Sequence, residues 1–139
     1  MTLELHATPE EVMRAVEALQ KFAEERRLPE RTICGLALAL EESACNIVNH
    51  GLQKDRAQRW RVSIELAKDS FVIELRDRGP EFDPTAAPQR ANQAQDNDLP
   101  GGWGIQLVRR NVDEILYQRS GGENILRLVK KLAQTNDKR

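Results

Sequence analysis

Glu42 and Asn46 are separated by one helical turn and form the first pair of side chains that could do chemistry together. Residues four positions apart on a helix lie one above the other on the same face. An amide oxygen can bind a hard cation, and Mg²⁺ is typically held by few protein ligands together with phosphates and water. A carboxylate one turn away can take a proton from a hydroxyl or from water. An ordinary solvated helix face has the same pattern, so this spacing alone leaves both interpretations open.

A second cluster, Asp77-Arg-Gly-Pro-Glu-Phe-Asp-Pro84, directly follows a strand-like segment. A carboxylate at a strand end can accept a hydrogen bond from an exocyclic amine, and Gly79 lets the backbone approach a ring closely. Asp, Gly and Pro are also common turn residues, so a plain turn is the alternative.

A third cluster, Gly101-Gly-Trp-Gly104, opens a predicted helix. Glycines permit close backbone approach, and the free N–H groups at a helix start attract phosphate. No Lys-Ser/Thr pair follows, which excludes a Walker loop, and the spacing is not that of dinucleotide-binding folds. A glycine turn is weak evidence by itself.

Hydrophobic periodicity predicts the elements that would position these clusters. Helices should begin at Thr8 and Glu30, a long loop should run from Asp77 to Gly102, and a short helix should follow it. The predicted elements, in order, are a strand at 2–6, helices at 8–27 and 30–50, strands at 60–67 and 71–76, a helix from 105, and strands around 115–117 and 125–132. This order predicts an α+β fold, a two-layer α/β sandwich with a mostly antiparallel sheet and helices on one face.

The second predicted helix has two different faces. Its core face is expected to hold six apolar residues: Ile33, Leu36, Leu40, Ala44, Ile47 and Val48. The opposite face carries polar residues beside two small ones: Glu42, Asn46, Asn49 and His50 with Gly35 and Ala39. This polar face should therefore have room beside it. Cys34 and Cys45 lie too far apart on the helix for a disulfide and are interpreted as small core-filling residues.

The composition fits one domain of 139 residues with a formal net charge of −1, from 21 Lys+Arg and 22 Asp+Glu. This balance argues against a partner that is nucleic acid or an anionic membrane. The sequence shows neither a signal-peptide pattern nor an apolar run of about 20 residues. We therefore expect a cytoplasmic protein with one domain over residues 1–133 and a polar tail at 134–139.

Taken together and in this order, the three clusters resemble the N, G1 and G2 boxes of the GHKL ATPase superfamily. The resemblance is strongest to its small one-domain branch, the bacterial anti-sigma factor serine/threonine-protein kinases. It extends from the first strand to about Leu132 and includes the run Gly-Gly-Trp-Gly-Ile and the spacing of Asp113, Tyr117, Gly122 and Asn124. It implies a Bergerat-type ATP-binding fold.

The resemblance also implies a role for each candidate site residue. Glu42 matches the catalytic base, Asn46 the Mg²⁺-binding asparagine, and Asp77 the residue that binds the adenine amino group. The glycines are expected to lie against the nucleotide: Gly79 under the base, and Gly102 and Gly104 at the phosphates. Residues 83–100 correspond to the ATP lid, and Glu81 stands where the G1 box usually has a second glycine.

The function that this resemblance implies is an ATP- and Mg²⁺-dependent kinase. It would phosphorylate a serine or threonine of a small antagonist protein, sequester a sigma factor by partner switching, and form a homodimer. The alternative is a non-catalytic nucleotide-binding partner-switching module. A self-contained histidine kinase is disfavoured, because His6 lies in a predicted strand and His50 ends a helix, whereas such a kinase carries its phosphorylated histidine on a dimerisation helix pair. A gyrase- or chaperone-like motor needs further domains.

Overall fold

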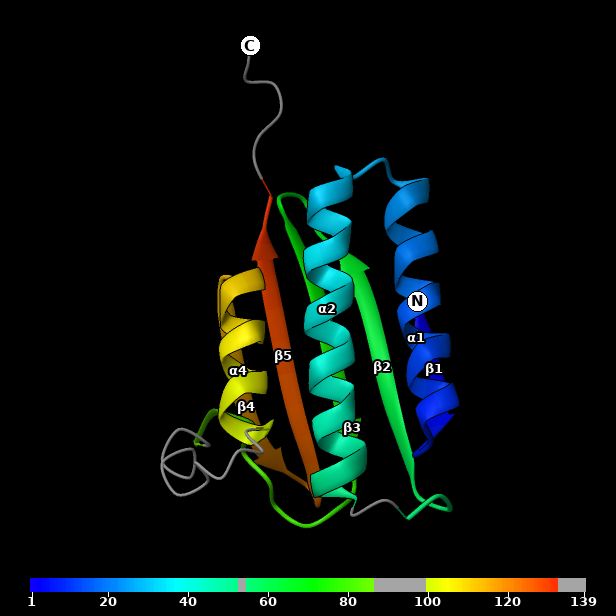
Figure 1. Ribbon diagram of the computed structural model, residues 1–139, viewed down its shortest axis with the longest axis vertical. Helices are drawn as coiled ribbons and strands as arrows, with labels where there is room; N and C mark the ends of the chain where they lie inside the picture. Colours follow the sequence, from blue (N-terminus) through cyan, green and yellow to red (C-terminus); the bar gives the residue numbers. More distant parts are fainter. Residues whose placement is uncertain (53–54, 87–99, 133–139) are drawn as a thin grey trace.

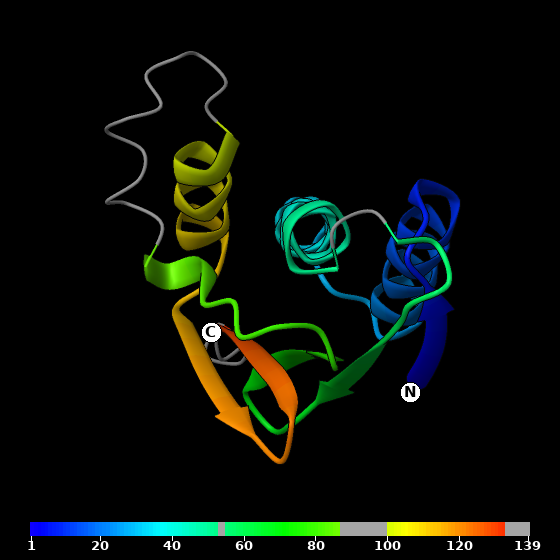
Figure 2. The same cartoon turned by 90° about the horizontal axis from the view of Figure 1, so that it is seen from below.

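Five strands form one antiparallel sheet, and three α-helices cover one of its faces (Figure 1, Figure 2). The computed structural model describes residues 1–52, 55–86 and 100–132, without the side chains of residues 100–103. The strands are β1 (Thr2–His6), β2 (Arg59–Leu66), β3 (Ser70–Asp77), β4 (Glu114–Ser120) and β5 (Glu123–Lys131). The helices are α1 (Pro9–Glu25), α2 (Glu30–Asn46) and α4 (Pro100–Asn111), with a π-helical turn η1 (Ile47–Gly51) and a 3₁₀ turn η2 (Pro84–Ala86). The expected α+β sandwich is confirmed.

The sheet has the strand order β1-β2-β3-β5-β4, so β3 lies in the middle. Alternate side chains of β2 and β3 point toward the helices, as period-two alternation predicts. The buried ones are Trp60, Val62, Ile64, Phe71, Ile73 and Leu75, each at most 1% exposed. These residues form the sheet side of the hydrophobic core.

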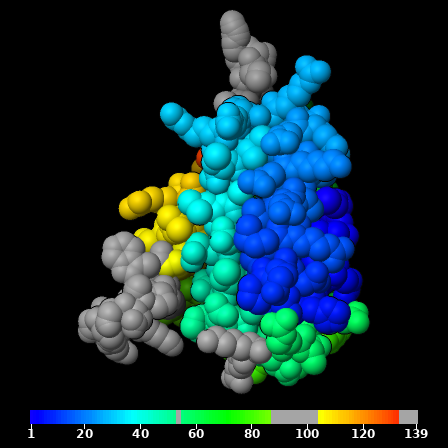
Figure 3. Space-filling model, turned by 45° about the vertical axis from the view of Figure 1, so that its right-hand side comes forward, coloured from blue at the N-terminus to red at the C-terminus, as the bar shows by residue number. Residues whose placement is uncertain are grey.

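The helices α1 and α2 pack side by side over the sheet (Figure 3). α1 begins where the sequence predicts, because the Thr8 hydroxyl accepts a hydrogen bond from the backbone N–H of Glu11 at 3.2 Å and Pro9 occupies the first turn. All six residues of the expected core face of α2 are buried: Ile33, Leu36, Leu40, Ala44, Ile47 and Val48.

The small residues on the other face of α2 allow α4 to pack closely against it. Ala39 is fully buried, and a Cβ atom added to Gly35 would lie 2.7 Å from Oδ1 of Asn111 in α4. The room predicted beside this face is therefore filled by α4, whose Gly104 also lies close to Glu42 and Asn46.

Some details differ from the sequence-based expectations. The helical segment reaches Gly51 as expected, but its last turn widens to π geometry, with the N–H of Leu52 bonded to the carbonyl of Ile47 at 2.7 Å. The prediction that both cysteines fill the core was wrong: Cys34 is exposed and Cys45 is half-buried. Each helical step turns the chain by about 100°, which carries Cys34 away from the face of the buried Ile33.

The loop predicted from Asp77 to Gly102 is shorter at its far end, because α4 begins at Pro100. The expected polar tail, 134–139, and most of the expected lid lie outside the described residues. None of the helices in the described ranges has the length and apolar character needed to cross a membrane.

Candidate nucleotide-binding site

Four elements bring the predicted site residues to the same end of the molecule, the lower end in Figure 1. α2 ends there with Asn46, β3 ends there with Asp77, β5 starts there with Glu123, and α4 starts there with Pro100. The antiparallel pairing of β3 and β5 places Asp77 directly opposite Asn124. Clusters that are far apart in the sequence therefore meet at one end of the sheet.

Asp77 is a buried carboxylate, 4% exposed, at the end of the central strand. Its Oδ1 accepts two hydrogen bonds, from the backbone N–H of Gly79 at 2.8 Å and from Nδ2 of Asn124 at 3.0 Å. Within the described part of the chain, no group donates a hydrogen bond to the other oxygen, Oδ2. A buried carboxylate oxygen needs a donor, so Oδ2 can accept one from a ligand's amine.

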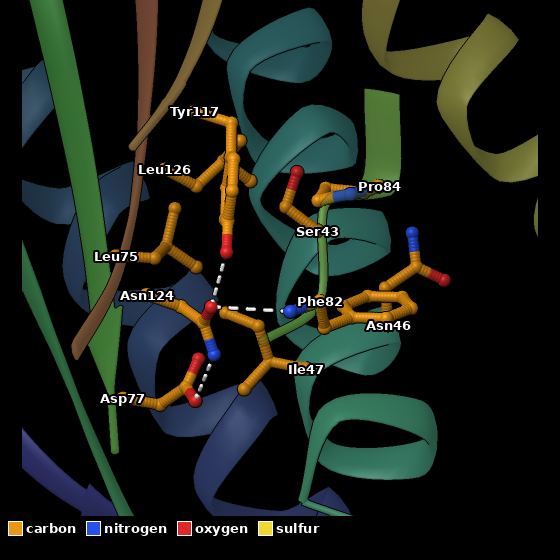
Figure 4. Close-up of a pocket in the computed structure, with 10 residues that line it drawn as sticks. All are labelled: Ser43, Asn46, Ile47, Leu75, Asp77, Phe82, Pro84, Tyr117, Asn124 and Leu126. Atoms are coloured by element: carbon orange, nitrogen blue, oxygen red, sulfur yellow. Dashed lines mark hydrogen bonds between the residues drawn. The ribbon is translucent and has the colours of Figure 1, made fainter. Parts of the chain in front are cut away.

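A small pocket lies between α2, the end of β3 and the segment after it (Figure 4). Its lining combines apolar side chains with three buried polar residues, Ser43, Asp77 and Asn124. The lining residues are Ser43, Asn46, Ile47, Leu75, Asp77, Phe82, Pro84, Tyr117, Asn124 and Leu126. Such a lining suits a flat aromatic base held by a few polar contacts.

The free volume of this pocket is about 10 Å³, room for about one water molecule. Phe82 closes it on one side: its ring stacks on His50, with centroids 6.2 Å apart, and lies against Gly51. A purine ring is much larger than one water molecule. Some of the lining must therefore move before a base can enter, and Phe82, which is partly exposed, is one candidate.

Gly79 lies in tight contact with the π-helical turn. A Cβ atom at this position would come within 2.9 Å of both the carbonyl oxygen of Gly51 and Cδ2 of Leu52. Backbone atoms cannot yield to such a contact, so only glycine lets the segment after β3 pack against the end of the α2 helix. Glu81, two residues later, has no positive φ and therefore replaces the usual glycine without backbone strain.

Glu42 and Asn46 lie side by side under the first turns of α4. A Cβ atom added to Gly104 would lie 2.8 Å from Oε1 of Glu42 and 3.6 Å from Nδ2 of Asn46. Partial burial, with a smaller contribution from the neighbouring Glu41 carboxylate, raises the pKa of Glu42 above its ordinary value of 4.5. A raised pKa suits a carboxylate that must accept a proton.

Gly102 lies in the first turn of α4, where the backbone is described and the side chains around it are not. The backbone N–H groups of such a first turn have no partner within the helix and favour anions. The position of Gly102 therefore agrees with a phosphate-binding role. The expected lid, 83–100, is described only at its two ends.

Sequence reasoning missed Asn124 as a site residue, although it noted Asn124 as part of a motif. Asn124 is 4% exposed and joins Asp77 to the segment after β3. Tyr117 and Arg119 were also missed: the Tyr117 hydroxyl donates to Asn124, and Arg119 donates to the carbonyl of Gly79 at 2.7 Å. The signal that could have found Asn124 is its place at a strand start, right after the tight turn at Gly121 and Gly122.

These residues fit ATP and Mg²⁺ on the chemistry of their side chains. Asp77 offers an amine a buried carboxylate oxygen to which no group in residues 1–52, 55–86 and 100–132 donates, and Asn46 offers an amide oxygen to a cation. In the described ranges, no three His, Cys, Asp or Glu side chains gather into a metal site. A hard cation here would therefore be bound by Asn46 together with phosphate oxygens, as is usual for Mg²⁺.

The antiparallel sheet carries its helices on one face, and the buried carboxylate of Asp77 ends its central strand. This arrangement agrees with a kinase- or ATPase-type domain. Residues 5–130 match the family model described as the histidine kinase-like ATPase domain, and the chain belongs to this family. The family is one of ATPases, so ATP is the nucleotide.

A curated relative is the serine/threonine-protein kinase BtrW of Bordetella bronchiseptica, which is 30% identical over 130 residues. The match covers 92% of this chain and 91% of the relative. The identity therefore extends over nearly the whole length of both proteins, and it supports kinase activity at the level of the family.

Two solved structures share the fold. The SiaB-SiaC complex from Pseudomonas aeruginosa matches with a TM-score of 0.71 and 17% identity, covering 93% of this chain and 88% of that one. The RsbU and RsbW domains of Rv1364c from Mycobacterium tuberculosis match with a TM-score of 0.65 and 18% identity. That match covers 97% of this chain, which spans 33% of the mycobacterial one.

Proposed function

We propose that this protein is a serine/threonine kinase that transfers the γ-phosphate of ATP to a small antagonist protein and sequesters a sigma factor by partner switching. The observation that carries the kinase part is the placement of the Glu42 carboxylate beside Asn46 and within 2.8 Å of a Cβ position on Gly104. In this proposal Glu42 is the proton acceptor, Asn46 is the cation ligand, and the start of α4 at Pro100 binds phosphate.

In the proposed reaction, a serine or threonine hydroxyl of the antagonist attacks the γ-phosphorus of ATP. The new O–P bond forms as the bond from the γ-phosphorus to the β–γ bridging oxygen breaks, and ADP leaves. Glu42 accepts the hydroxyl proton, and its raised pKa makes it a better acceptor than an ordinary glutamate. Mg²⁺, when bound, neutralises charge on the phosphates, and Asn46 would hold it.

Asp77 provides base specificity in this proposal. Its Oδ2 would accept a hydrogen bond from the adenine amino group, while Oδ1 is already occupied by Gly79 and Asn124. Gly79 would lie at the base, and Gly102 and Gly104 at the phosphates, with residues 83–100 as the lid. The proposed ATPase domain comprises residues 1–133, followed by the polar tail at 134–139.

The partners in this proposal are protein partners. Support comes from the fold shared with SiaB, whose structure was solved as a SiaB-SiaC complex, and with the RsbW domain found beside RsbU. We further propose a cytoplasmic homodimer, with neither nucleic acid nor membrane as a direct partner, in keeping with the net charge of −1.

A second candidate function is a nucleotide-binding partner-switching module without phosphotransfer. The observation that favours it is the small volume of the pocket, about 10 Å³, which Phe82 closes on one side. A pocket that opens rarely would release its nucleotide slowly, so the protein could act through its nucleotide-bound state without repeated phosphotransfer.

A phosphotransfer assay separates the two functions. The purified chain is incubated with γ-labelled ATP, Mg²⁺ and candidate antagonist proteins, and the label on the antagonist is followed by gel electrophoresis. A label that is stable to acid, as serine and threonine phosphates are, supports the kinase. ATP binding by calorimetry without transfer to any antagonist would favour the binding module.

A further inference from the structure

Asn124 makes five hydrogen bonds through its buried side-chain amide, and those to Asp77, Phe82 and Tyr117 are drawn in Figure 4. The weakest runs from Nδ2 to the carbonyl of Gly79 at 3.5 Å. Its Nδ2 donates to Oδ1 of Asp77 at 3.0 Å and to the carbonyl of Pro80 at 2.9 Å. Its Oδ1 accepts from the backbone N–H of Phe82 at 3.2 Å and from the Tyr117 hydroxyl. An asparagine side chain offers two donor hydrogens and two acceptor lone pairs, so this amide is fully satisfied.

This pattern fixes which way the amide points. A flipped amide would place its oxygen against the carboxylate of Asp77 and the carbonyl of Pro80, two groups that can only accept. It would also place its NH₂ group against the N–H of Phe82, which can only donate. Each buried unmatched pair costs the desolvation free energy of the groups involved. Asn124 therefore presents a donor to Asp77 in one fixed orientation.

The fixed donor in turn fixes the carboxylate of Asp77. The Nδ2 of Asn124 and the N–H of Gly79 both bond the same oxygen, Oδ1, so the carboxylate plane is held from two sides. The second oxygen is left without a protein donor among the described residues. An acceptor that is held in place before binding discriminates better between ligands than one that must be ordered by the ligand.

Asn124 also bonds the segment that leads into the expected lid, through the carbonyl of Pro80 and the N–H of Phe82. Phe82 is the side chain that closes the pocket. One amide therefore contacts both the carboxylate proposed to bind the base and the backbone of a residue that closes the pocket on one side.

We infer that Asn124 is a positioning residue for nucleotide specificity: it holds Asp77 so that one oxygen accepts from a 6-amino group, and it couples this carboxylate to the segment at Phe82. This inference rests on the proposed binding of ATP through Asp77. In this inference, Asn124 contributes to the preference for a 6-amino purine over a 6-oxo purine, in addition to any contribution to the stability of the fold.

The test compares ATP with inosine triphosphate, which carries a carbonyl oxygen where adenine has its amine. Calorimetric titration in the presence of Mg²⁺ gives the dissociation constant of inosine triphosphate divided by that of ATP. A general loss of affinity for both nucleotides cancels in this ratio. We expect wild type to prefer ATP, and Asn124→Leu, which has no polar side-chain atom, to reduce the ratio about fivefold or more. Asn124→Ala should reduce the ratio too and provides the test if the leucine variant does not fold.

Two controls sharpen the result. Arg127→Leu changes an exposed residue of the same strand outside the pocket and should leave the ratio within about twofold of wild type. In an Asp77→Asn background, Asn124→Ala should not lower the ratio further, because the carboxylate that it positions is gone. Circular dichroism and thermal melting establish that each variant is folded.

A folded Asn124 variant that loses affinity for both nucleotides equally, with an unchanged ratio, would overturn the inference and leave Asn124 as an anchor of the segment after β3. If wild type binds neither nucleotide, the proposed ATP-binding function itself is wrong, and the inference falls with it. The two failures are distinguished by the wild-type titration alone.

Discussion

Gly104 and Glu42, 62 positions apart in the sequence, are in direct contact: a Cβ atom on Gly104 would lie 2.8 Å from Oε1 of Glu42. Real Cβ atoms essentially never come this close to another atom, so a larger residue at position 104 would displace the Glu42 carboxylate, and glycine lets the carboxylate keep its present position beside α4. The glycine therefore leaves space for the Glu42 side chain, in addition to the phosphate contact that the sequence predicts for its backbone.

The first prediction concerns Gly104→Ala. The new methyl group must push aside the flexible carboxylate of Glu42, so phosphotransfer should fall by about 10²-fold through misplacement of the base. The free energy of unfolding should change by less than about 1 kcal/mol, because alanine favours the helix and the carboxylate can yield. Gln106→Ala, on an exposed position of α4, is the control and should keep full activity. Equal rates for Gly104→Ala and wild type would show that Glu42 does not need its present position.

The second prediction concerns the base itself. Glu42→Gln keeps the shape of the side chain and removes its ability to accept a proton. We expect phosphotransfer to fall by about 10²–10⁴-fold, while ATP affinity changes little because the fold and the other site residues stay. Single-turnover transfer and calorimetry measure the two effects separately. If the variant transfers phosphate as fast as wild type, Glu42 is not the base.

The third prediction is a pH dependence of stability. The folded-state pKa of Glu42 is raised above its ordinary value of 4.5, so between these two pKa values the folded state binds more protons than the unfolded state. The contribution of Glu42 to stability therefore decreases as pH rises through this window. Glu42→Gln should be more stable than wild type at pH 7, with a difference that shrinks below about pH 4.5, as urea unfolding at both pH values would show. Exposed Glu65→Gln is the control and should show a smaller change with pH.

The fourth prediction concerns Asp77→Asn. Two donors, Gly79 and Asn124, hold the Oδ1 position, so the amide oxygen should take this place and the NH₂ group should face the pocket. A donor then meets the adenine amine, and ATP affinity should fall by about 5–150-fold, or about 1–3 kcal/mol. Asp69→Asn, in the exposed turn at the other end of the hairpin, is the matched control. Unchanged affinity in a calorimetric titration of Asp77→Asn would refute its adenine role.

The fifth prediction concerns the metal. Asn46 lines the pocket on α2, and alanine is a better helix former there, so Asn46→Ala should fold. We expect ATP binding by this variant to lose its dependence on Mg²⁺, measured as the ratio of affinities with Mg²⁺ and with a chelator. Exposed Asn49→Ala, one turn later, should keep the dependence. Full Mg²⁺ dependence in a folded Asn46→Ala variant would mean that another group binds the cation.

Local patterns in the sequence were sufficient for most of the fold. The spacing of Ile33, Leu36 and Leu40 predicted the buried face of α2, and Thr8 and Pro9 predicted the start of α1. These features depend on residues within one or two turns. The π-helical end of α2 was not predicted, because it forms where a long helix meets the segment around Gly79, a contact between distant parts of the chain.

In the candidate site, too, some contacts follow from nearby residues in the sequence and others depend on distant parts of the chain. Glu42 and Asn46 are neighbours on one helix, so their proximity follows from spacing alone. Asn124 lies opposite Asp77 only through the register of β3 and β5, two strands that are not consecutive in the chain. Contact between Gly104 and Glu42 depends on how closely α2 and α4 pack. Register and helix packing are properties of the whole fold, so the local signal at Asn124, a strand start after a glycine turn, does not show which residue it faces.

The central place of β3 has a consequence for hydrogen exchange. β3 is hydrogen-bonded to β2 on one side and to β5 on the other, so its amide protons should exchange with solvent only when the whole domain unfolds. Asp77 thus ends the most protected segment of the chain, whereas α4 packs on one side of α2 and can open locally at a lower free energy. A ligand bound between Asp77 and Gly104 would slow hydrogen exchange mainly in α4, because the amide protons of β3 already exchange only on global unfolding.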